Sequence, residues 1–187
     1  GNSVTKLFLV NSNDKILKKI SLPSNPMTNS ILKKKFKVLI KDFKKIEKIL
    51  FCSVVPKNFN FIKRFISKKT NVRCYEIKDL KLRSVLNIRA NFKQVGSDRL
   101  ANAISLLNPK KNFIILDFGT ATTFDVLVKN TYRGGVIAPG ISISLNTLTD
   151  KASLIPKINL KKMKKVIGIN TNSAVRSGFF WGYAGLI

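Results

Sequence analysis

Two aspartates flank a run of small hydroxyl residues in the segment DFGTATTFDVL, which extends from Asp117 to Leu127. The chain carries only 9 acidic residues against 35 lysines and arginines, so this placement needs a reason. Because glycine has no Cβ, a Gly-Thr turn lets backbone N–H groups and hydroxyls approach a phosphate closely. Asp117, at the end of an apolar run, stands where a carboxylate can hold a hard cation. The segment is a candidate phosphate and cation site, although any glycine turn before a strand has the same local pattern.

The segment GSDRLANA, residues 96–103, contains a third candidate carboxylate. If Asp98 lies within hydrogen-bond reach of an alcohol, it can accept the alcohol proton during phosphoryl transfer, a contribution of about 10²- to 10⁴-fold. An aspartate at the start of a helix also caps the helix or complements its dipole. Arg99 is either a surface arginine or a clamp for a carboxylate or phosphate. The local sequence leaves both pairs of alternatives open.

The composition limits the chemistry of the chain. Histidine is absent, which excludes His-dependent triads and His-ligated metals within these 187 residues. Neither a Walker pattern nor GxGxxG occurs, so the common phosphate-binding folds are not supported. The net charge of +26 attracts phosphate-bearing partners. The lysines are scattered in short clusters along the chain, which favours solvated faces over a specific nucleic-acid surface.

Cysteine usage and hydropathy indicate a cytoplasmic protein. Cys52 and Cys74 lie in apolar contexts without CxxC spacing, so we expect reduced thiols. No run of about 18 uncharged apolar residues occurs, and we expect no membrane partner. The chain opens on Gly1 and closes at Ile187 inside a helical apolar pattern, so we expect a fragment.

Alternating strand and helix patterns position the candidate residues, and this alternation indicates an α/β fold. The predicted strands cover residues 5–10, 15–22, 48–55, 71–77, 113–119, 122–129 and 134–140. The predicted helices cover residues 29–46, 59–69, 96–107, 142–154 and 171–187. The first two strands should form a hairpin. The run 113–119 is apolar enough to predict a central strand.

The last predicted helix contains GFFWGYAG, residues 178–185. Its glycines, Gly178, Gly182 and Gly185, fall near one helical face and predict close helix packing. We expect the aromatic side chains to fill core or dimer contacts.

An internal repeat is visible in the chain. Residues 1–11, GNSVTKLFLVN, align without gaps on residues 119–129, GTATTFDVLVK. Each copy has a glycine, small and hydroxyl residues, a β-run and a turn. Two related halves are the natural inference, although a glycine turn before any strand produces a similar match.

Four successive segments resemble motifs of the type III pantothenate kinases. They are GSDRLANA, DFGTATTFDVL, GGVIAPGISISLNTL and IGINTNSAVRSGFFWGYAGLI, which begin at residues 96, 117, 134 and 167. SVVP at 53–56 also fits the family, and GNSVT at 1–5 resembles the remainder of its N-terminal nucleotide-binding turn. The resemblance covers nearly the whole chain in order.

The resemblance implies a duplicated, ribonuclease-H-like (actin-like) α/β fold of the acetate and sugar kinase superfamily. Two mixed sheets flanked by helices would enclose an ATP cleft between the halves. Residues 1–110 would form the first half, truncated at its N-terminus, and residues 111–187 the second, truncated at its C-terminus. A homodimer would transfer the γ-phosphoryl group of ATP to the hydroxyl of pantothenate, the first step of coenzyme A biosynthesis. The implied cofactors are Mg²⁺ and a monovalent cation, K⁺ or NH₄⁺.

Roles follow from the resemblance position by position. Asp98 matches the proton acceptor, and Asp117 matches the monovalent-cation ligand. Substrate-binding positions match Gly96, Ser97, Asp98, Arg99 and Thr171. ATP-binding positions match Gly1, Asn2, Ser3, Val4, Thr5, Lys6 and Thr120.

Two departures from the family pattern leave alternatives open. The family carries an aspartate two residues before its first glycine, a position that precedes Gly1. Arg89 stands where the family usually has a tyrosine near the substrate. Besides the kinase, the alternatives are a kinase for another small hydroxylated acid and a non-catalytic member acting as a regulatory or nucleic-acid-associated accessory protein.

Overall fold

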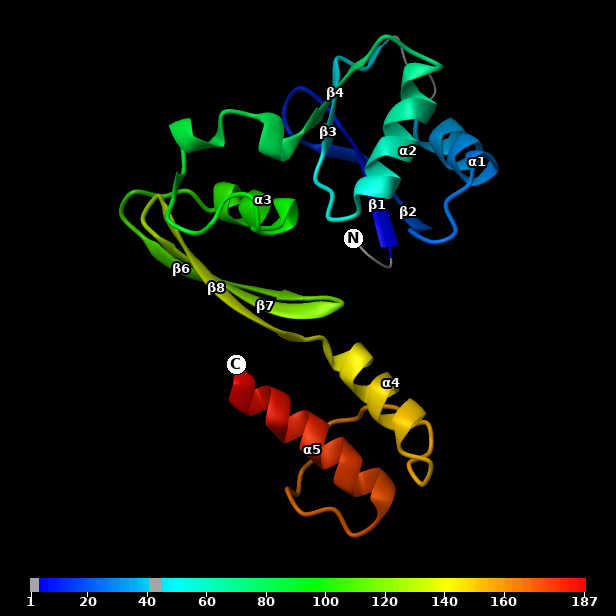
Figure 1. Ribbon diagram of the computed structural model, residues 1–187, viewed down its shortest axis with the longest axis vertical. Coiled ribbons are helices and arrows are strands. Elements are labelled where there is room, and N and C mark those ends of the chain that lie inside the picture. The colour runs from blue at the N-terminus through cyan, green and yellow to red at the C-terminus, as the bar shows by residue number, and fades with distance from the viewer. Residues whose placement is uncertain (1–3, 41–44) are drawn as a thin grey trace. The chain divides into compact units, whose positions relative to one another are not determined.

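The computed structural model describes residues 4–40 and 45–187 of the chain (Figure 1). Its contacts divide the chain into two compact units. The first comprises Gly1–Phe113 with Asp125–Gly134, and the second comprises Ile114–Phe124 with Gly135–Ile187. Within the described ranges, no helix is both long and apolar enough to cross a membrane.

The first unit begins with the predicted hairpin. Strands β1 (Val4–Val10) and β2 (Ile16–Pro23) pair antiparallel. The turn between them is closed by a hydrogen bond of 3.0 Å from the Asn11 N–H to the Lys15 carbonyl. Asp14 adopts a positive φ of 58°, which aspartate tolerates better than most residues. The polar turn and the two apolar runs therefore form the hairpin that the sequence predicts.

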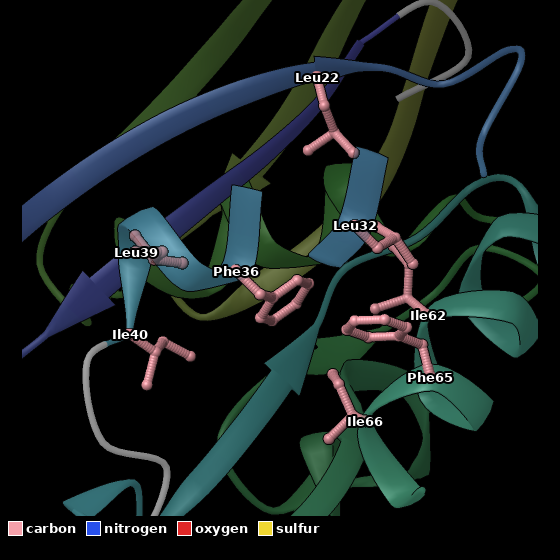
Figure 2. Close-up of a cluster of buried hydrophobic side chains, with 8 residues drawn as sticks. All are labelled: Leu22, Leu32, Phe36, Leu39, Ile40, Ile62, Phe65 and Ile66. Atoms are coloured by element: carbon pink, nitrogen blue, oxygen red, sulfur yellow. The ribbon is translucent and has the colours of Figure 1, made fainter. Parts of the chain in front are cut away.

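Two amphipathic helices cover this region and form its core (Figure 2). Helix α1 (Asn29–Leu39) begins at Thr28, whose side chain accepts the Ile31 N–H, and helix α2 (Pro56–Ser67) begins with a proline. Their apolar faces bury side chains together with Leu22 of β2, and the cluster consists of Leu22, Leu32, Phe36, Leu39, Ile40, Ile62, Phe65 and Ile66. A fully buried aliphatic side chain in such a cluster contributes about 1.5–3 kcal/mol to folding.

A parallel strand pair leads from this core toward the candidate substrate segment. Strands β3 (Lys48–Phe51) and β4 (Arg73–Glu76) pair in parallel. Short 3₁₀ helices η2 (Ile77–Asp79) and η3 (Leu82–Ser84) follow, and then strand β5 (Asn87–Ile88). Helix α3 (Ser97–Ser105) comes next and buries Leu100 and Ala103 completely.

A four-stranded sheet follows α3, with the order β5-β8-β7-β6. Its long strands are β6 (Asn112–Phe118), β7 (Ala121–Val128) and β8 (Thr131–Pro139). The prediction that residues 113–119 form a central strand is wrong, because β6 lies at the edge of this sheet. Ile114 is 67% exposed and Phe118 is 54% exposed. The apolar run alone does not distinguish an edge strand with an open face from a strand covered on both sides.

Two helices complete the second unit. Helix α4 (Ile141–Lys151) and helix α5 (Thr171–Leu186) contact each other, and Tyr183 Oη lies 3.0 Å from Ser144 Oγ. The glycines of α5 do not mediate the predicted close packing within the described residues. A Cβ added at any of the three would meet no atom within 4 Å.

The structure supports the expected α/β fold class, but its sheets differ from those expected. The alternation of strands and helices gives a mixed α/β chain, but its described strands form three small sheets rather than the expected two. The gapless repeat maps β1 onto residues 122–128, which lie within β7. The duplicated ribonuclease-H-like arrangement and its boundary at residue 110 stay predictions.

Candidate functional site

The first turn of α3 carries the predicted proton acceptor. Gly96 is the N-cap residue, in extended conformation with φ −63° and ψ 145°, and Ser97 and Asp98 lie in the first turn. The interpretation of Asp98 as the helix cap is therefore wrong. Asp98 Oδ1 instead accepts the N–H of Arg99 at 2.9 Å. The carboxylate remains at the helix N-terminus, where the helix dipole stabilises negative charge.

Gly96 allows this arrangement because it has no side chain. A Cβ at this position would lie within 3.0 Å of Asp98 Oδ1. The Asp98 carboxylate therefore occupies the space that any other residue at position 96 would fill. A side chain at position 96 would therefore displace the Asp98 carboxylate, a side-chain group, rather than the backbone.

Ser97 ties the start of α3 to the end of β4. Its side chain is 3% exposed, and its hydroxyl donates to Glu76 Oε1 at 2.5 Å. The other carboxylate oxygen, Oε2, accepts the Lys78 N–H at 2.6 Å and caps helix η2. The sequence analysis gave Ser97 a substrate-binding role and did not identify Glu76 as its partner.

Arg99 is held by a buried carboxylate. Its Nε donates to Asp125 Oδ1 at 2.7 Å, and its Nη2 lies 2.6 Å from the same oxygen. The side chains of Arg99 and Asp125 are 14% and 0% exposed. Burial lowers the pKa of Arg99, but the hydrogen bond and the charge of Asp125 raise it above the ordinary value overall. Arg99 is therefore not an ordinary surface arginine.

Tyr132 completes this network from the neighbouring strand β8. Its hydroxyl donates to Asp125 Oδ1 at 2.5 Å, and the whole residue is buried. Burial and the hydrogen bond to the Asp125 carboxylate both raise the pKa of Tyr132 above its ordinary value. The phenol consequently remains a proton donor at neutral pH. Sequence reasoning assigned no role to Asp125 and missed this network.

The thiol pKa of Cys52 is affected by the negative charges near α3. Its thiol pKa is raised to about 11, first by desolvation and then by the negative charges of Asp98 and Glu76. The residue as a whole is exposed, whereas its thiol is partly desolvated. The two carboxylates therefore lie near enough to Cys52 to act on it electrostatically.

The predicted ATP and cation residues of the second unit cluster at the turn between β6 and β7. Asp117, Gly119 and Thr120 are all exposed there. The Gly119 N–H donates to the Ala121 carbonyl at 2.9 Å, and the Gly140 N–H donates to the Thr120 carbonyl at 3.0 Å. Gly140 is buried and packs closely against this turn. A Cβ at position 140 would lie within 3.0 Å of the carbonyl oxygens of Gly119 and Thr120.

This turn fits a hard cation in the chemistry of its donors. The Asp117 carboxylate and the backbone carbonyls of the turn are oxygen ligands, which hard cations prefer. No cluster of three or more metal-binding side chains occurs in residues 4–40 and 45–187. A cation at Asp117 would therefore depend on backbone oxygens, water or phosphate for its remaining ligands.

The remaining predicted residues lie elsewhere in the two units. Thr171 is the exposed first residue of α5, directly after the N-cap Asn170. On β1, Val4 and Lys6 are exposed, and Thr5 Oγ1 lies 2.9 Å from Ser24 Oγ. Gly1, Asn2 and Ser3 lie outside the described residues. Arg89 is exposed, and its N–H donates to the Tyr132 carbonyl.

Two apolar cavities of about 490 and about 430 Å³ lie along α5 in the second unit. Phe179 and Tyr183 line both cavities. None of the predicted site residues lines either cavity, and almost all of the lining surface is apolar. The GSDR segment, in the first unit, and the turn at Gly119, in the second, are thus the polar candidate sites.

Comparisons with known proteins agree with the resemblance seen in the sequence. A family model described as type III pantothenate kinase matches residues 1–187. The type III pantothenate kinase of Pelagibacter ubique (strain HTCC1062) is 61% identical over 187 residues, which cover 100% of this chain and 75% of that protein. The type III pantothenate kinase of Sulfurihydrogenibium sp. (strain YO3AOP1) is 41% identical over 147 residues, covering 76% of this chain and 57% of that protein.

A solved structure shares the fold. It is the crystal structure of a conserved Baf family protein from Campylobacter jejuni, described as a transcriptional activator. The TM-score is 0.52 at 19% sequence identity, over 90% of this chain and 69% of that one. At this identity the likeness concerns the fold alone.

Proposed function

The chain belongs to the type III pantothenate kinase family, and from this premise we propose which of its residues carry out phosphoryl transfer. It is the chain of a pantothenate kinase, an enzyme of coenzyme A biosynthesis, and ATP is the phosphoryl donor that the family implies. In our proposal the hydroxyl oxygen of pantothenate attacks the γ-phosphorus of ATP. The bond from that phosphorus to the β-γ bridging oxygen breaks, and ADP leaves.

Asp98 accepts the proton of the attacking hydroxyl. The observation that carries this assignment is the Gly96–Asp98 contact, in which the missing Cβ gives the carboxylate its place over the start of α3. The N–H of Arg99 holds Oδ1, which fixes the carboxylate in one orientation. A base oriented in this way contributes about 10²- to 10⁴-fold to the rate.

The neighbouring residues bind the substrates. Gly96, Ser97 and Thr171 contact pantothenate, and Arg99 supplies a positive charge for an anionic group of the substrate. The Gly-hydroxyl turns bind ATP, one through Thr120 and the other through residues 1–6. Phosphoryl transfer then depends mainly on positioning and charge neutralisation.

Cations complete the proposal. Asp117 would hold a monovalent cation, K⁺ or NH₄⁺, which when bound supplies positive charge near the phosphates. Mg²⁺ would enter with ATP, because Mg²⁺ is usually held by substrate phosphates and few carboxylates. The functional enzyme in this proposal is a homodimer.

The proton acceptor is tested by Asp98→Asn in the full-length protein. We expect kcat to fall by about 10²- to 10⁴-fold while the KM for pantothenate changes little, since the amide keeps the shape but cannot accept the proton. The matched control is Asp150→Asn, an exposed acid at the end of α4, which should leave kcat unchanged. Near wild-type kcat in Asp98→Asn would refute the assignment.

A further inference from the structure

The proposed transfer gives no role to Asp125, a charged residue that is completely buried. All of its described interactions converge on one oxygen. Arg99 Nε and Nη2 lie 2.7 and 2.6 Å from Asp125 Oδ1, and Tyr132 Oη lies 2.5 Å from it. Two hydrogen-bond donors from two elements, Arg99 Nε and Tyr132 Oη, thus hold a single carboxylate oxygen, and Arg99 Nη2 adds an ion pair to it.

A contribution to stability does not by itself account for this network of buried polar groups. A buried ion pair often contributes less than well-packed apolar residues of similar volume, because both charges lose their hydration. The second oxygen of Asp125, Oδ2, is also buried and has no hydrogen-bond partner among the described residues. An unpaired buried oxygen of this kind requires an explanation.

The position of Arg99 offers one. It directly follows Asp98 in the first turn of α3, whereas Asp125 and Tyr132 project from strands β7 and β8. A guanidinium has five N–H donors in a rigid planar fork. Asp125 accepts a hydrogen bond from Nε and lies within ion-pair distance of Nη2, which itself has no hydrogen-bond partner among the described residues, so the guanidinium is held while donors remain for another group.

We propose that Asp125, assisted by Tyr132, is a positioning residue for the kinase reaction: it orients the Arg99 guanidinium toward an anionic group of the substrate. This inference rests on the proposed role of Arg99 in binding pantothenate. Asp125 and Tyr132 touch neither substrate, and they act only through Arg99. Tyr132 fixes the rotation of the Asp125 carboxylate by donating to the oxygen that Arg99 also uses.

The high pKa of Tyr132 is consistent with this role. A phenol whose pKa is raised stays protonated at neutral pH and can donate to the carboxylate there. Loss of its hydroxyl in Tyr132→Phe leaves the Arg99–Asp125 pair in place but removes one of the donors. The effect of Tyr132→Phe should therefore be smaller than the effect of removing the Asp125 charge.

The test is a double-mutant cycle on Arg99→Lys and Asp125→Asn in the full-length protein, with steady-state kinetics for pantothenate and for ATP. We expect each single variant to lower kcat/KM for pantothenate by about 10- to 100-fold, since small misplacements of a binding group cost up to about 10²-fold. The KM for ATP should stay unchanged. The double variant should be no worse than Arg99→Lys alone, because Asp125 acts only through Arg99.

Tyr132→Phe keeps the test decisive if Asp125→Asn does not fold. It should lower kcat/KM for pantothenate by about 3- to 10-fold, a smaller share of the loss expected for the charge. Ile66→Val, in the core of the first unit, serves as a control that lowers stability and should leave both KM values unchanged.

Different results overturn different statements. If Arg99→Lys lowers kcat/KM but folded Asp125→Asn and Tyr132→Phe remain at the wild-type value, the positioning role is wrong and the proposed function stands. Multiplying effects in the double variant would also overturn the inference, since Asp125 would then act independently of Arg99. If Arg99→Lys itself keeps wild-type kinetics, the substrate role of Arg99 fails together with the inference.

Discussion

Replacement of Gly140 by alanine tests whether the turn at Gly119 and Thr120 is held by close backbone contact. Gly140 has φ −72° and ψ 151°, a conformation that any residue adopts, so alanine causes no backbone strain there. The new Cβ would instead lie within 3.0 Å of the carbonyl oxygens of Gly119 and Thr120. The effect of the substitution is therefore purely steric.

The magnitude follows from these contacts. Overpacking of a tight site typically costs about 1–3 kcal/mol, and a displaced turn also strains the hydrogen bond from the Gly140 N–H to the Thr120 carbonyl. At about 3 °C per kcal/mol for a protein of this size, Tm should fall by about 3–9 °C. Because the same turn is proposed to bind ATP, a shift of about 1 Å should lower kcat/KM for ATP by at least about 10-fold.

Gly182→Ala on α5 is the matched control. A Cβ at this position meets no atom within 4 Å, and alanine is favoured over glycine in a helix by about 0.5–1 kcal/mol. In thermal unfolding, Gly140→Ala should lower Tm, whereas Gly182→Ala should raise it slightly. In ATP titrations, only Gly140→Ala should change kcat/KM for ATP. Wild-type Tm and ATP kinetics in Gly140→Ala would refute the close contact.

Three further predictions concern the first unit. Ser97→Ala leaves Glu76 Oε1 without its hydrogen bond, so the free energy of unfolding in urea should fall by about 1–2 kcal/mol; an unchanged midpoint would show that the contact contributes nothing. Cys52 has a thiol pKa of about 11, so iodoacetamide should alkylate it slowly at pH 8. Glu76→Gln removes a negative charge that raises this pKa and should therefore speed the alkylation, which mass spectrometry can follow. Equal rates in the two proteins would contradict the electrostatic cause. Because the pKa of Tyr132 is raised, the phenol stabilises the folded state fully below about pH 10, and this stabilisation declines at higher pH. Above about pH 10 the free energy of unfolding should therefore fall more steeply in the wild type than in Tyr132→Phe. Parallel curves for the two proteins would exclude the role of this phenol.

Local patterns in the sequence predict the helices and strands better than they predict the contacts between them. The helix at residues 96–107 follows from an apolar face with Leu100 at its centre, and α3 forms there because that face is buried. The hairpin at the start of the chain follows from a polar turn between two apolar runs. Both are short-range features, which hydrophobic periodicity and turn chemistry determine.

Contacts between distant residues are beyond such patterns. Asp125 lies 26 residues from Arg99 in sequence, and no local rule pairs them. One signal was available: Asp125 and Leu127 are two positions apart on β7, so the acid lies on the same buried face as the leucine. A carboxylate on a buried strand face requires a cation or hydrogen-bond donor as its partner, so the pattern predicts that Asp125 has a partner but does not identify which residue it is.

The edge strand β6 has a consequence for the handling of the protein in solution. Ile114, Leu116 and Phe118 alternate along one face of this strand and are at least 37% exposed, next to an edge whose backbone groups can pair with another strand. Self-association through this edge is opposed by the net charge of +26, which makes copies of the chain repel each other. Salt screens that repulsion, with a Debye length of only about 8 Å at 0.15 M. We therefore expect self-association to increase as ionic strength rises, which light scattering across a salt series would detect.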